Sequence, residues 1–237
     1  MINDISIDYE NTHKQQLNQF LKSKRTNGDY KVIDIGGSVG NWFNDNIDAI
    51  MDFFPPKTDF DGTFFKGDIT KQSGWDNILE YVGKNGKFDF CICRHTLEDI
   101  NNPEFVCEMM SKISNEGWIA VPSKYFELAK GVYSRDTRGL HHHRWIFATH
   151  KGSVYGLPKM GWTDSFTDEE LAPVFANKKS GPTWALELSF FWEKKPNINW
   201  LLSIVDNLPD DYCDEYIRGK LRGHPWDVWL SILRDED

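Results

Sequence analysis

The stretch Tyr30–Phe43, YKVIDIGGSVGNWF, places an acid and three glycines at the end of a short apolar run. Glycine permits positive φ and lets a ligand approach the backbone closely, as in the first strand-to-helix turn of many nucleotide-binding folds. The same glycines would also suit a plain tight turn. The residues of this loop that could contact a ligand are Asp34, Gly36, Gly37, Ser38 and Gly40.

Two further acids follow later apolar runs. Asp52 ends the run IDAIMDF (47–53), and Asp68 lies at the end of GTFFKGDI (62–69). A carboxylate at the end of the second strand can accept hydrogen bonds from ribose hydroxyls. The carboxyl ends of parallel strands meet at one edge of a sheet, so we expect these acids and the glycine loop to form one ligand site.

The elements that position these residues are predicted to be buried parallel strands. Continuous apolar runs cover residues 30–35, 47–53, 62–69, 87–94 and 117–123, which is typical of a sheet covered on both faces. A helix is predicted after Asn102, with Pro103 in its first position. The fold class is therefore α/β, a doubly wound and mostly parallel sheet, with irregular C-terminal additions.

The rest of the chain is expected to add elements before and after this sheet in the sequence. Residues 1–29 are predicted to form a short helical extension, residues 30–205 the main domain, and residues 206–237 a helical tail packed on it. A hairpin is expected around HRWIFATHKGSVYGLPK, and a long strand over 184–195. Only Asn41–Asn46 separate the glycine loop from the second strand, which is too short for a full crossover helix.

The order of these motifs resembles the class I S-adenosylmethionine-dependent methyltransferases over about residues 30–123. DIGGSVG is similar to that family's D/E-x-G-x-G-x-G loop, with Ser38 in place of the middle glycine, and FKGDIT is similar to its third-strand segment. FDFCICRHTLED and the helix and strand after it resemble the small-molecule methyltransferases, whose motif is H-x-L-E-H; Asp99 stands where that motif has its second histidine.

This resemblance implies S-adenosylmethionine as the cofactor. The glycine loop would hold the amino-acid end of the cofactor, Asp52 its ribose and Asp68 its adenine, and Arg94 would also contribute to cofactor binding. An NAD-binding Rossmann domain is the alternative interpretation of the glycines. It requires a helix N-terminus to receive the pyrophosphate, and the short crossover disfavours such a helix.

Histidines supply the candidate catalytic groups, namely His95, His142 and His143. His95 follows the fourth strand, while His141–His143 precede the predicted strand RWIF. A histidine suits removal of a proton from a hydroxyl or amine near neutral pH. Other interpretations of the His141–His143 cluster are a metal site, which would need a further ligand, and plain surface residues; we predict no metal.

The composition and charge of the chain limit the kinds of binding partner that we expect. The net charge is −9 and no Lys/Arg run is present, so nucleic acid is not expected as a partner. No apolar segment is long enough to span a membrane, and the four scattered cysteines suit reduced thiols in the cytoplasm. The sequence predicts methyl transfer to a small polar acceptor, such as a sugar or surface-glycan precursor. The alternative is a non-catalytic methyltransferase-like scaffold, and the oligomeric state is not predicted.

Overall fold

The computed structural model describes residues 5–37, 46–56, 59–132, 135–159, 163–164, 166–176, 178–201 and 231–234. Close contacts group the chain into two compact units. The first comprises Met1–Val121 with Ser189–Pro196, and the second comprises Pro122–Leu188 with Asn197–Asp237. Most of the predicted C-terminal tail lies outside the described residues, and within it residues 231–234 are helical. The predicted short crossover lies outside them as well, apart from Asn46.

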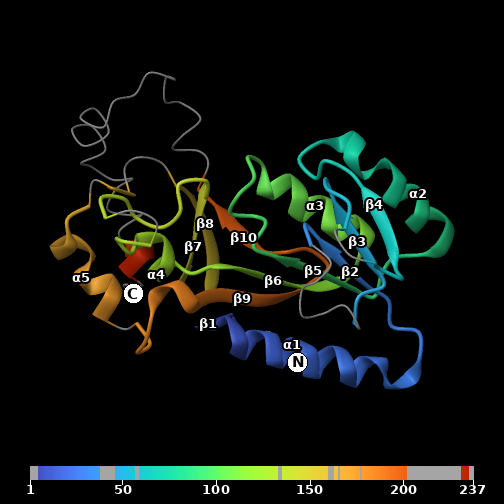
Figure 1. The fold of residues 1–237 in the computed structure, drawn as a ribbon, viewed down its shortest axis with the longest axis horizontal. Coiled ribbons are helices and arrows are strands. Elements are labelled where there is room, and N and C mark those ends of the chain that lie inside the picture. Colours follow the sequence, from blue (N-terminus) through green and yellow to red (C-terminus); the bar gives the residue numbers. More distant parts are fainter. Residues whose placement is uncertain are drawn as a thin grey trace. The chain divides into compact units, whose positions relative to one another are not determined.

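A seven-stranded sheet is the centre of the first unit (Figure 1). The strand order is β1-β9-β6-β5-β2-β3-β4, and β2 pairs in parallel with β3 and β5, as do β3 with β4 and β5 with β6. The strands are β1 (Ser6–Tyr9), β2 (Val32–Ile35), β3 (Ala49–Asp52), β4 (Thr63–Lys66), β5 (Phe90–Arg94), β6 (Glu116–Pro122) and β9 (Leu186–Glu193). The predicted doubly wound, mostly parallel α/β fold is confirmed.

Helices cover both faces of this sheet, as buried parallel strands require. They are α1 (Glu10–Lys24), α2 (Asp76–Asn85) and α3 (Pro103–Ile113), with short 3₁₀ turns η1 (Arg25–Asn27) and η3 (Gln72–Trp75). The predicted start of α3 is confirmed, because the Asn102 side chain accepts a hydrogen bond from the backbone N–H of Phe105. Strand β1 and helix α2 were not predicted, and α1 has 15 residues where the sequence predicted a short helix. No helix of the described segments has the length and apolar character needed to cross a membrane.

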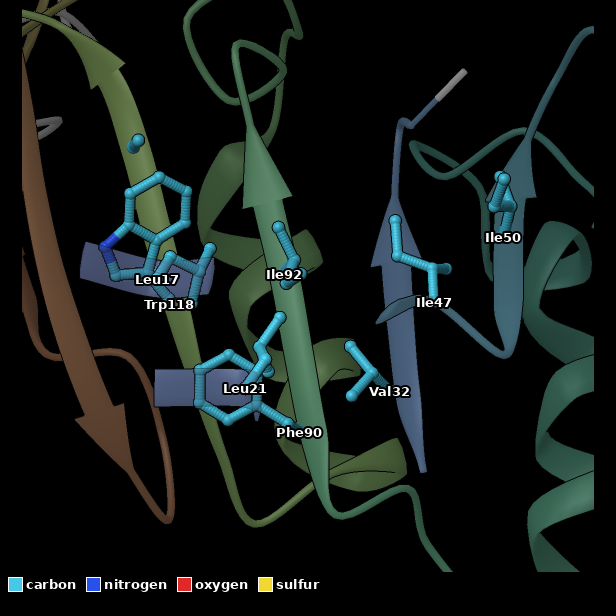
Figure 2. Close-up of a cluster of buried hydrophobic side chains, with 9 residues drawn as sticks. Leu17, Leu21, Val32, Ile47, Ile50, Phe90, Ile92 and Trp118 are labelled. Atoms are coloured by element: carbon cyan, nitrogen blue, oxygen red, sulfur yellow. The ribbon is translucent and has the colours of Figure 1, made fainter. Parts of the chain in front are cut away.

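The core between α1 and the sheet explains why α1 is helical and where it lies. Leu17 and Leu21 are fully buried and share one face of the helix, since they are four residues apart. They pack against side chains from the strands, including Val32, Phe90 and Trp118 (Figure 2). Burying each leucine stabilises the fold by roughly 1.5–3 kcal/mol. On the opposite face, buried Cys91, Cys93 and Cys107 bring β5 against α3, and all three are free thiols.

The second unit contains a three-stranded sheet in the order β10-β8-β7. The predicted hairpin is confirmed as β7 (Trp145–His150) and β8 (Ser153–Pro158), which pair antiparallel. The unpredicted β10 (Ile198–Trp200) adds in parallel to β8, and the Trp200 ring lies where a Cβ on Gly156 would stand. The helical elements of this unit are α4 (Lys124–Leu128), α5 (Asp168–Ala176) and the turn η5 (Thr183–Ala185).

Replacing Leu21 with alanine is expected to lower the free energy of unfolding by about 2–5 kcal/mol, because the cavity would open at the centre of the α1 contact. Urea denaturation measures the change. Gln16→Ala is the matched control, because Gln16 lies on the exposed side of the same helix. Equal, small effects of the two substitutions would show that α1 does not close the core.

Candidate functional site

A cavity of about 440 Å³ opens at the carboxyl edge of the seven-stranded sheet. It takes residues from the ends of four neighbouring strands, β2, β3, β4 and β5. The order of the strands along the chain reverses between β2 and β5, and open α/β sheets bind ligands at such a switch point. The lining residues are Gly36, Asp52, Phe53, Phe54, Gly67, Asp68, Ile69, Thr70, His95, Thr96, Asp99 and Ile100.

Gly36 is a residue of the glycine loop that lines the cavity. Its φ is +73°, and its N–H donates to the carbonyl of Met51 at 2.8 Å, which ties the exit of β2 to β3. A Cβ at this position would stand 2.4 Å from Oγ1 of Thr96. Glycine is therefore required here by the fold itself, because any side chain would be strained and would collide with the neighbouring strand end.

Asp34 lies beneath the same loop and is 7% exposed. One of its oxygens, Oδ1, is buried and has no hydrogen-bond partner. The other oxygen, Oδ2, lies only 2.0 Å from the position that a Cβ on Gly37 would take, so a side chain at Gly37 would collide with it. Burial raises the pKa of Asp34 to about 7; the charge of Arg94 opposes this rise, and the charge of Asp52 adds to it. A buried acid with a perturbed pKa beside a cavity is typical of a functional site.

Asp52 and Asp68 both line the cavity, as the sequence predicted that strand-end acids would. Asp52 Oδ1 accepts a hydrogen bond from the backbone N–H of Phe54 at 2.7 Å. Asp68 accepts from the Thr70 hydroxyl at 2.6 Å and pairs with Lys71 at 2.9 Å; the Thr70 hydrogen bond and then Lys71 lower its pKa to about 2. Both acids keep acceptor capacity for a ligand, since each carboxylate oxygen has two lone pairs.

His95 lies on the same wall as Gly36, directly after β5. Its φ is +46°, a left-handed conformation that is uncommon outside glycine, and its N–H donates to the carbonyl of Ala120 at 2.9 Å. Its Nδ1 lies 3.3 Å from Oε1 of Glu98, a buried carboxylate. Thr96, the next residue, donates its hydroxyl to the carbonyl of Arg94 at 3.0 Å.

His142 and His143 belong to the second unit, and their surroundings differ from those of His95. His143 is buried, and its Nδ1 lies 2.5 Å from Oε1 of Glu127, whose Oε2 accepts from Lys159 Nζ at 2.5 Å. The ring of His143 also stacks on Phe126. The exposed His142 ring meets that of His143 edge-on at 4.6 Å. In this unit, His143 completes a buried ionic network.

The remaining predicted residues divide into two groups. Ser38 and Gly40 lie outside the described residues. Asp34, Gly37 and Arg94 are described but do not line the cavity. Arg94 pairs instead with Glu10 of α1 at 2.5 Å and acts on the site through its charge beside Asp34.

Sequence reasoning missed several lining residues, above all the pair Phe53 and Phe54. Their rings contact each other edge-on at 5.1 Å and are 55% and 72% exposed. Large exposed apolar rings at a cavity mouth are unusual and suit contact with a planar or apolar ligand group. Their position directly after Asp52, at a predicted strand end, was the signal that could have identified them.

A scan against protein-family models finds no match, and neither does a search among curated proteins. Among solved structures, the chain is similar to an S-adenosylmethionine-dependent methyltransferase from Mesorhizobium loti, with 13% identity and a TM-score of 0.32; the match covers 60% of this chain and 62% of that one. It is also similar to the small RNA methyltransferase HEN1, with 12% identity and a TM-score of 0.37, covering 79% of this chain and 26% of that one.

A third similar structure is the N-terminal domain of EvdMO1, determined in the presence of SAH and D-fucose. The identity is 8% and the TM-score 0.31, with 76% of this chain and 82% of that one covered. The chain spans less than two thirds of the length of the first two structures. At these TM-scores the likeness supports no conclusion about chemistry, and the fold class rests on the strand order of the sheet.

Replacing Asp34 with asparagine is expected to stabilise the ligand-free protein at pH 8. The raised pKa means that the folded state binds a proton more tightly than the unfolded state, so wild-type stability falls as pH rises from about 4 to 7. The asparagine removes this penalty and should gain on the order of 1–3 kcal/mol at pH 8 and little at pH 4.5. Urea denaturation at both pH values measures it, with exposed Asp61→Asn as the control. A loss of stability at pH 8 would contradict the expected burial of an ionised carboxylate.

His143→Ala is expected to lower the free energy of unfolding by about 1–3 kcal/mol, because it leaves Glu127 buried with one partner fewer. His142→Ala removes an exposed ring and should change it by less than about 0.5 kcal/mol. Thermal unfolding of both variants, followed by tryptophan fluorescence, gives the comparison. Equal effects at the two positions would contradict the network described for this unit.

Proposed function

We propose that the protein transfers a methyl group from S-adenosylmethionine to a small polar acceptor, such as a sugar or a surface-glycan precursor. The observation that carries this proposal is the cavity at the switch point, which is lined by Gly36, two strand-end carboxylates and a histidine. Its volume of about 440 Å³ lies within the range of small-molecule and cofactor sites.

The residues of the cavity fit this cofactor in chemical type. S-adenosylmethionine supplies a methyl group activated by a positively charged sulfonium. Asp52 offers a carboxylate to ribose hydroxyls, and Asp68 extends the same wall as an ionised acceptor for an amine. The exposed Phe53 and Phe54 offer ring faces to a purine.

Catalysis in this scheme depends mainly on placement, because methyl transfer is an in-line displacement. The protein must hold the acceptor oxygen opposite the sulfur and exclude water. A hydroxyl acceptor must also lose its proton, and His95 is the histidine that lines the cavity among the described residues. His142 and His143 lie in the other unit and remain proposed catalytic residues.

The acceptor class follows from composition. A net charge of −9 without a Lys/Arg cluster disfavours a phosphate-backbone partner, which needs clustered cations. A small molecule with hydroxyl or carboxyl groups requires only hydrogen-bonding groups within the cavity. The proposed setting is cytoplasmic, where reduced thiols such as those of Cys91 and Cys93 are typical.

Isothermal titration with S-adenosylmethionine and S-adenosylhomocysteine tests the proposal. Wild type is expected to bind both, and Asp52→Asn to weaken binding by about 1–3 kcal/mol through loss of charge-assisted hydrogen bonds. The matched control is Asp61→Asn, an exposed acid outside the cavity, which should bind as wild type does.

Two outcomes would contradict the assignment. Binding by wild type with no effect of Asp52→Asn would remove Asp52 from the cofactor site. If titration of the wild type with either ligand releases no heat and produces no thermal shift, the alternative function stands. In that case the chain is a methyltransferase-like domain that serves as a binding or scaffold protein.

A further inference from the structure

Glu98 is a buried acid without a role in the helix start. It is 1% exposed, and its Oε1 lies 3.3 Å from Nδ1 of His95. Its other oxygen, Oε2, is buried and has no hydrogen-bond partner. The residue that caps the following helix, α3, is Asn102. Burying a carboxylate is costly, and helix capping does not explain why Glu98 is buried.

The backbone of His95 is held in a conformation that costs energy. A non-glycine residue in the left-handed region is strained and persists when its surroundings impose that conformation. Here the N–H bond to Ala120 and the packing of Thr96 against Gly36 fix the turn. The turn places the histidine ring on the cavity wall, with its side chain 38% exposed. Such strain is typical of functional positions.

We propose that Glu98 is a positioning residue that holds Nδ1 of His95, so that the ring takes a proton from the acceptor hydroxyl through Nε2. A carboxylate in this place keeps the proton of the neutral ring on Nδ1 and stabilises the imidazolium that forms. This inference rests on the proposed function and narrows the acceptor to a group with an ionisable O–H.

The reaction balances with these groups alone. The acceptor oxygen forms a bond to the methyl carbon as the carbon–sulfur bond breaks, and the bonding pair stays on sulfur. The sulfonium becomes the neutral thioether of S-adenosylhomocysteine. The hydroxyl proton passes to Nε2 of His95, and the resulting imidazolium lies against the Glu98 carboxylate until solvent removes the proton.

Nitrogen NMR tests the contact without any acceptor or cofactor. The probe is the full chain labelled with ¹⁵N at histidine, and the His95 signals are assigned from their loss in His95→Asn. Asparagine is the suitable replacement because it tolerates the left-handed backbone. The neutral His95 ring is expected to carry its proton on Nδ1, since that proton faces Glu98.

Variants of Glu98 separate its charge from its acceptor atom. Glu98→Gln keeps an oxygen acceptor and should retain the Nδ1–H form of His95, whereas Glu98→Leu should shift the ring toward the Nε2–H form. Glu108→Gln on the exposed side of α3 is the control and should match wild type. A His95 ring protonated on Nε2 in the wild type would overturn the inference. That result needs only the wild-type protein, so it holds even if Glu98→Leu does not fold.

Enzyme turnover provides a second test of the role of Glu98. Acceptors are found by screening hydroxylated and carboxylated sugars for release of S-adenosylhomocysteine. His95→Asn is then expected to lower kcat by about 10²–10⁴ and Glu98→Gln by at least about tenfold, with the Kd of S-adenosylhomocysteine unchanged in both. Full turnover in Glu98→Gln would refute the positioning role, while absence of S-adenosylhomocysteine binding in the wild type would refute the proposed function instead.

Discussion

The site depends on one close approach, that of the Gly36 backbone to the Thr96 side chain between the ends of β2 and β5. There is no room for a Cβ at Gly36, and the positive φ directs the chain out of β2 while its N–H remains bonded to Met51. This contact lies at the switch point of the sheet, where chains leave in opposite directions and a cavity can open. Gly36 is therefore a packing requirement, and the same packing places its backbone on the lining of the cavity.

The buried acids around that contact are costly for the fold. Asp34 and Glu98 are both buried, and each has one carboxylate oxygen without a hydrogen-bond partner. Asp34 lies two residues before Gly36 in the sequence, and Glu98 lies two residues after Thr96. Helix α1 offsets part of this cost, because its first residue, Glu10, pairs with Arg94, whose charge opposes the rise in the pKa of Asp34. The helix that closes the core thus also contacts Arg94, a cation whose charge acts on Asp34. Stability and site electrostatics are coupled through α1.

Sequence patterns predicted the parts of this arrangement that repeat. Five apolar runs identified the parallel strands β2 to β6, and the acids at their ends predicted the cavity edge. Strand β1 has only four half-buried residues, too few for a periodic signal, and its pairing with β9 joins chain segments far apart in the sequence. The contact between Glu98 and His95 was not predicted, because the left-handed backbone of His95 has no signature in the sequence pattern. Phe53 ends the apolar run 47–53, so its position in the sequence gives no sign that its ring is exposed.

His95 and His143 differ in their surroundings, and the difference bears on how each could take part in proton transfer. His143 contacts Glu127 and Phe126, and Glu127 also pairs with Lys159, so a change of charge at His143 would disturb the ion pair between Glu127 and Lys159. His95 has one buried carboxylate at Nδ1 and a partly exposed ring on the cavity wall. A proton gained by His95 is stabilised on one side and accessible to solvent on the other. The left-handed backbone of His95 and its place on the cavity lining occur together, and strained residues of this kind cluster at functional sites.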